Sequence, residues 1–85
     1  MHMDRAIFDL RASVEATSLY ILICALLDQG EERVTLNRAF QQWNGTREEL
    51  MQAADELSRR GVVSFPRGSW GDDDPVRLES RESWR

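Results

Sequence analysis

A run of nine apolar residues, LYILICALL at positions 19–27, constrains the fold of this chain more than any other feature. Thr17 or Ser18 can cap a helix here, and Gly30 ends it. A helix that is apolar all round has to be covered on more than one side. The rest of an 85-residue domain covers one side. We therefore expect the second cover to come from residues 4–16 or from the same helix of a second subunit.

The segment before this run, DRAIFDLRASVEA at positions 4–16, predicts a helix, because Ile7, Leu10 and Val14 fall on one face at helical spacing. Two helices that separate near Thr17 and one continuous helix that bends there fit the pattern equally. Because the apolar run offers more surface than so small a domain can cover, we expect residues 4–29 to form a homodimer interface.

Residues 34–61 predict a helix-turn-helix, two short helices joined by a tight turn. A short strand, RVT, comes just before it. Thr35 can cap the first helix, and the dipeptide Asn44-Gly45 breaks it. The residues of this helix at inward spacing are Ala39, Phe40 and Trp43.

The second helix of this pair has clear signals at both ends. Thr46 and Glu49 stand three residues apart, the spacing of a capping box. Gly61 ends the helix, with Arg59 and Arg60 in its last turn. The buried stripe predicted between these signals consists of Leu50, Ala53, Ala54 and Leu57.

Residues 62–79 predict a β-hairpin. Val63 and Phe65 alternate with polar residues, and so do Val76 and Leu78, as in two half-buried strands. The connecting stretch PRGSWGDDDP is rich in turn-forming residues. Residues 80–85 form a polar tail that also contains Trp84.

This order of elements resembles the winged helix-turn-helix superfamily over Leu19 to Leu78, chiefly in the stretch TLNRAFQQWNGTREELMQAADELSRRGVV. The resemblance implies an α+β, mostly helical fold: a winged helix-turn-helix with an extra N-terminal helix and a C-terminal β-hairpin wing. Residues 1–85 then form a single domain. The resemblance points to small bacterial regulators, so the first function we expect is a DNA-binding transcriptional regulator that binds double-stranded DNA.

If the second helix enters a major groove, its outermost positions meet the DNA. With Leu50, Ala54 and Leu57 turned inward, these positions are Glu48, Gln52, Asp55 and Arg59. Thr46 lies at the start of the same helix. The arginines that we expect to contact phosphates are Arg38, Arg47, Arg59, Arg67 and Arg77.

The charge of the chain favours an alternative. The formal net charge is −4, the isoelectric point is about 4.9, and the chain has no lysine. Such a protein repels polyanions at long range. The alternative function is therefore an acidic winged-helix module that binds a protein through Trp70, Glu48 and Asp55. Trp70 either lies exposed at the wing tip as a contact residue or folds back over the hairpin.

Other chemistry is not indicated, so we expect neither an enzyme nor a bound cofactor. The triplet Asp72-Asp73-Asp74 lacks the alternation and distal glutamate of a calcium loop, and His2 has no partner at zinc spacing. Met1-His2 is either a cloning remnant before a natural start at Met3 or part of the natural chain. Cys24 has no second cysteine to pair with, and no apolar run is long enough to span a membrane. These features predict a cytoplasmic protein.

Overall fold

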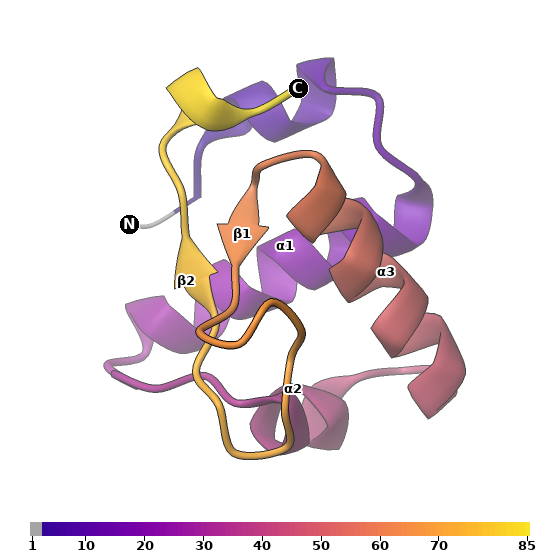
Figure 1. The fold of residues 1–85 in the computed structure, drawn as a ribbon, viewed down its shortest axis with the longest axis vertical. Helices are drawn as coiled ribbons and strands as arrows, with labels where there is room; N and C mark the ends of the chain where they lie inside the picture. Colours follow the sequence, from indigo (N-terminus) through magenta and orange to yellow (C-terminus); the bar gives the residue numbers. More distant parts are fainter. Residues whose placement is uncertain (1–2) are drawn as a thin grey trace.

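Helices come first along the chain and a small antiparallel hairpin follows (Figure 1). The computed structural model describes residues 3–85, so Met1 and His2, with the predictions made for them, lie outside the described residues. The fold is α+β and mostly helical, as predicted. In chain order, with η marking a 3-10 helix, the elements are η1 (Arg5–Asp9), α1 (Val14–Asp28), α2 (Leu36–Gln42), α3 (Arg47–Arg59), β1 (Val63–Ser64), β2 (Arg77–Leu78) and η2 (Arg81–Ser83).

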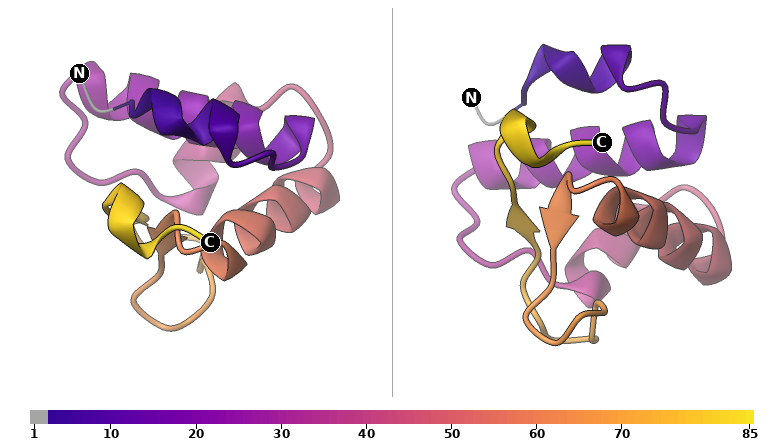
Figure 2. Two further views of the ribbon diagram at one scale, coloured as in Figure 1. Left: turned by 90° about the horizontal axis from the view of Figure 1, so that it is seen from above. Right: turned by 45° about the horizontal axis from the view of Figure 1, so that its top comes forward.

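Helix α1 lies at the centre of the molecule, with η1 on one side and α3 and the hairpin on the other (Figure 2). Leu19 and Ile23 of α1 are fully buried, and so is Ile7 of η1. The Tyr20 hydroxyl accepts a hydrogen bond from the Asp4 backbone N–H at 2.9 Å, which holds η1 against α1. The second cover of the apolar run is thus the N-terminal segment of the same chain, one of the two covers predicted.

The predicted helix over residues 4–16 is wrong, because the chain turns at residues 10–13. Arg11 has a φ of 60°, in the left-handed region that interrupts a helix. Ser13 caps α1, and its own N–H and hydroxyl donate to the Glu56 carboxylate at 2.8 and 2.7 Å. The break therefore lies before α1, and α1 runs through Thr17 without interruption.

Three large apolar side chains of residues 4–29 stay exposed: Phe8, Val14 and Ile21. Val14 was predicted to face inward, but it is 78% exposed, because it opens the new helix α1 and no longer continues the face of Ile7. The homodimer interface through residues 4–29 stays a prediction.

The first helix of the predicted pair, α2, begins as expected. The Thr35 hydroxyl accepts the Arg38 backbone N–H at 3.2 Å, and Ala39 is buried. Phe40, predicted to face inward, is 37% exposed. Helix α2 has only seven residues and ends before Trp43, whose backbone is extended. Helical spacing is therefore a poor guide to the positions of the Phe40 and Trp43 rings.

The second helix, α3, matches its predicted boundaries and inner face. The Thr46 hydroxyl accepts the Glu49 backbone N–H at 3.1 Å, and the Glu49 carboxylate accepts the Thr46 backbone N–H at 2.9 Å. Gly61 follows the helix with a φ of +72°, and a Cβ there would collide with the Ser83 carbonyl. The predicted stripe of Leu50, Ala53, Ala54 and Leu57 is buried.

The hairpin is confirmed, although each strand has only two residues. Strands β1 and β2 run antiparallel with Val63 opposite Leu78. The Val34 carbonyl accepts the Val76 backbone N–H at 2.9 Å, so the predicted strand at 33–35 contributes a short bridge to the hairpin. This bridge ties the hairpin to the start of α2.

Cys24 lies in the core of α1 and is 2% exposed. Burial raises the pKa of its thiol to about 11. Among residues 3–85, no helix combines the length and the apolar character needed to cross a membrane.

Candidate functional site

The outer face of α3 consists of Glu48, Gln52, Asp55 and Arg59. All four residues are exposed, so the prediction that they point away from the core is confirmed. Arg59 Nε donates to the Asp55 carboxylate at 2.9 Å across one helical turn. Among residues 3–85, Glu48 is then the charged residue of this face that has no ion pair.

Arg38, which we expected to contact phosphate, is held by Glu31. Its Nε and Nη2 donate to the two oxygens of the Glu31 carboxylate, each at 2.8 Å. These hydrogen bonds raise the pKa of Arg38 and lower the pKa of Glu31. An arginine in such a bidentate pair has to lose its partner before it can bind a phosphate in the same way.

Two further arginines pair with acids of the loop between β1 and β2. Arg47, at the start of α3, forms an ion pair with Asp72, and its guanidinium carbon lies 5.7 Å from the centre of the Phe40 ring. Within the loop, Nε of Arg67 lies 3.9 Å from Oδ2 of Asp74. Both arginines therefore face a carboxylate of their own chain.

Two further residues expected at a DNA interface, Thr46 and Arg77, differ in whether their side chains already have a partner. Thr46 uses its hydroxyl for the cap of α3. Arg77 on β2 is exposed and has no ion pair among the described residues. Of the five arginines expected to contact phosphates, four have a carboxylate partner in the structure.

Trp70 lies folded into the hairpin loop and is 3% exposed. Its ring stacks on Phe65, with centroids 5.4 Å apart and 16° between the planes. Its indole N–H donates to the Asp74 carbonyl at 2.9 Å. The folded-back position, one of the two predicted, is confirmed, because both the ring and the N–H find partners inside the loop. Little of the ring is left for contact with another molecule.

The acidic triplet 72–74 fastens the loop to the body, a role that its sequence did not indicate. The Asp72 carbonyl accepts the Asn37 backbone N–H at 3.3 Å, and the Asp73 carbonyl accepts Nη2 of Arg33 at 3.4 Å. The loop accordingly lies against α2 and the start of α3 (Figure 1). Local patterns could not reveal these contacts, because the side-chain partners of Asp72 and Asp73 lie 25 and 40 residues away.

Other reactive groups are buried or unassisted. Burial raises the pKa of the Tyr20 hydroxyl to about 12, and the Cys24 thiol is enclosed in the same core. Within residues 3–85, no group of three or more His, Cys, Asp or Glu residues is placed to hold a metal ion. Comparison of the chain with protein-family models, with curated proteins and with solved structures found no match.

Proposed function

We propose that this chain is a protein-interaction module with a winged helix-turn-helix fold, and that its partner is a protein and not DNA. The fold is supported by the order of three helices and an antiparallel hairpin, and by the bridge from Val34 to the hairpin. Four of the five arginines expected to meet DNA are paired with acids of the same chain, which supports the choice of partner. This function is the alternative that the sequence raised.

The pairing of the arginines is the observation that carries this proposal. Nonspecific affinity for DNA comes mainly from lysine and arginine side chains that neutralise phosphates. Here Glu31, Asp55, Asp72 and Asp74 already occupy four of the five arginines in question. A DNA strand would have to displace these acids and approach a chain of net charge −4.

A DNA-binding transcriptional regulator is the second candidate, and the exposure of α3 favours it. Gln52 and Arg59 lie on the open side of a well-capped helix, and glutamine and arginine are the side chains that read adenine and guanine. Arg77 is free to reach a phosphate. The two candidates predict opposite results in a DNA titration.

The test is fluorescence anisotropy of a labelled duplex of mixed sequence, with salt raised from about 50 to 200 mM. Wild type is compared with the double variant Glu48→Gln/Asp55→Asn, which removes two acids from the outer face of α3. Asp9→Asn/Glu32→Gln removes two exposed acids elsewhere and serves as the matched control.

We expect no salt-sensitive binding by any of the three proteins. Binding by wild type that weakens steeply as salt rises would support the regulator and contradict the proposal. So would DNA affinity that rises in the α3 double variant and not in the control, because the acids would then face DNA.

A further inference from the structure

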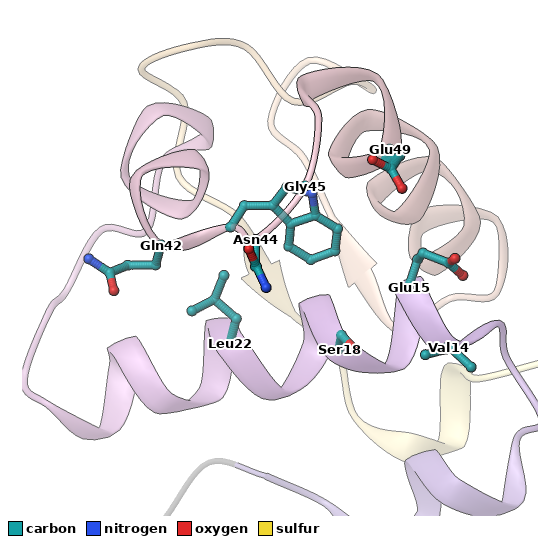
Figure 3. Close-up of a pocket in the computed structure, with 9 residues that line it drawn as sticks. Val14, Glu15, Ser18, Leu22, Gln42, Asn44, Gly45 and Glu49 are labelled. Carbon is teal, nitrogen blue, oxygen red and sulfur yellow. The ribbon is translucent and has the colours of Figure 1, made fainter.

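We infer that a groove between α1 and the α2–α3 turn binds a segment of the partner protein in which a basic side chain lies beside an apolar one. This inference rests on the proposed function. The groove has a volume of about 410 Å³. Figure 3 shows Val14, Ser18 and Leu22 along α1 on one side of it, and Asn44 and Gly45 of the turn on the other. We call it the Trp43 groove, because the Trp43 side chain also lines it.

The Trp43 groove has apolar walls that the chain itself leaves open. Val14 contributes a side chain that is 78% exposed, and Leu22 and Trp43 are partly buried. Removal of apolar surface from water is favourable. A bound side chain with an apolar stem would therefore be stabilised here.

Two carboxylates, Glu15 and Glu49, line the same groove and lie at the end that α3 closes (Figure 3). The Thr46 backbone N–H holds one oxygen of Glu49, which fixes this carboxylate in place and lowers its pKa. The Glu15 carboxylate has neither a hydrogen bond nor an ion pair among residues 3–85. A neighbouring hollow shares both glutamates and adds Glu56.

The groove differs in its charge from four acidic positions that lie before α2, on α3 and in the hairpin loop. There, Glu31, Asp55, Asp72 and Asp74 each face an arginine. No described residue that lines the Trp43 groove or the neighbouring hollow is basic. Part of the acidic excess of the chain is therefore left uncompensated at a site with apolar walls.

A basic side chain with an apolar stem complements both properties of the Trp43 groove. Its stem can lie along Leu22 and Trp43 while its charge meets Glu15 and Glu49. Arginine suits the site best, because a guanidinium pairs with carboxylates in a fixed geometry and also stacks on indole. Phosphates would be repelled by the same carboxylates.

The probe is the peptide N-acetyl-Leu-Arg-Leu-amide, added to ¹⁵N-labelled protein and followed by two-dimensional NMR. We expect shifts at the Trp43 indole N–H and at the backbone N–H groups of Glu15 and Gly45, with little change at the Trp70 indole. The dissociation constant should be on the order of 1 mM. Citrulline in place of arginine, which keeps the shape and removes the charge, should weaken binding by about three- to five-fold.

Glu15→Gln should weaken peptide binding by about three- to five-fold. Glu32→Gln is the matched control, because Glu32 is also an exposed acid but does not line the groove. Its affinity should equal that of wild type. Val14→Ser should also weaken binding, and it removes a side chain that is already 78% exposed, so folding is preserved.

An absence of shifts at Trp43, or equal affinity in wild type and Glu15→Gln, overturns the inference. Shifts of the same resonances that depend on protein concentration without peptide would also overturn it, since a second copy of the chain would then fill the groove. If neither the peptide nor the DNA duplex binds, the inference about the groove is overturned and the proposed function is not. Salt-sensitive DNA binding removes the proposed function whatever the peptide does.

Discussion

The turn that contains Trp43 and the loop that contains Trp70 enclose their tryptophan side chains to different degrees. Trp43 follows an apolar helical pattern, yet it is only partly buried, and its enclosed indole N–H has no acceptor among residues 3–85. Trp70 stands among turn-forming and acidic residues, yet it is 3% exposed and its N–H is bonded. Helical spacing places a side chain only as far as the helix extends, and α2 ends at Gln42.

The two regions differ in what their neighbours supply. The ring of Trp70 stacks on Phe65, and its indole N–H donates to the Asp74 carbonyl. Gly45 lies beside Trp43, and a Cβ added there would stand 2.9 Å from the indole nitrogen. A donor that is buried without an acceptor lowers stability, whereas a bonded one contributes to it.

Alanine at each position gives the largest expected effects. Trp70→Ala should lower the free energy of unfolding by about 3–5 kcal/mol, the range for removing a buried large aromatic side chain. Trp43→Ala should lower it by about 1–3 kcal/mol, because less of its ring is buried and an unsatisfied donor disappears with it. Urea unfolding followed by circular dichroism measures both values. A larger loss for Trp43→Ala would reverse the comparison.

The elements held by near neighbours were predictable from sequence, and those held by distant partners were not. The caps at Thr35 and Thr46 act over three residues, so the starts of α2 and α3 could be predicted. Ser13 also caps α1 over three residues, at Ala16, but its bonds to Glu56 lie 43 residues away, and this start was missed. The outward positions of α3 followed from helical geometry. The pairing of Arg47 with Asp72 depends on how the loop folds, which its sequence alone did not determine.

Phenylalanine at the same two positions isolates the two N–H groups. Trp70→Phe should lower the free energy of unfolding by about 1–2 kcal/mol, because the Asp74 carbonyl loses its donor and the smaller ring stacks less well on Phe65. Trp43→Phe should change it by less than about 0.5 kcal/mol, since the donor it removes has no acceptor. The same urea experiment applies. Equal losses would mean that the Trp43 N–H is satisfied in solution.

The smallest expected effect is a pH dependence confined to the turn. The Thr46 backbone N–H lowers the pKa of Glu49 below its ordinary value of 4.5. A carboxylate with a lowered pKa in the folded state stabilises the fold above its ordinary pKa, and this contribution is lost as pH falls through the lowered value. Wild type should therefore lose this part of its stability below about pH 4.5.

Glu49→Gln should flatten that part of the profile, and Glu48→Gln should not. Urea midpoints at pH 7 and pH 3 give the change in stability, and the indole N–H resonances report on each tryptophan separately. We expect acid to shift the Trp43 resonance in wild type and to shift it less in Glu49→Gln, because the Glu49 carboxylate and the Trp43 indole nitrogen both adjoin Gly45. An identical acid response in wild type and Glu49→Gln would show that the capping box does not govern the turn.

The buried thiol of Cys24 can serve as a built-in probe of unfolding. The thiolate is the form that reacts with thiol reagents, and burial raises the pKa of Cys24 to about 11, so in the closed state very little of it is ionised at neutral pH. Cys24 is the sole cysteine of the chain, so a thiol reagent labels this position alone. Because the side chain is 2% exposed, the reagent reaches it only when the centre of α1 opens. The labelling rate then distinguishes a local fluctuation from global unfolding, without any added probe site.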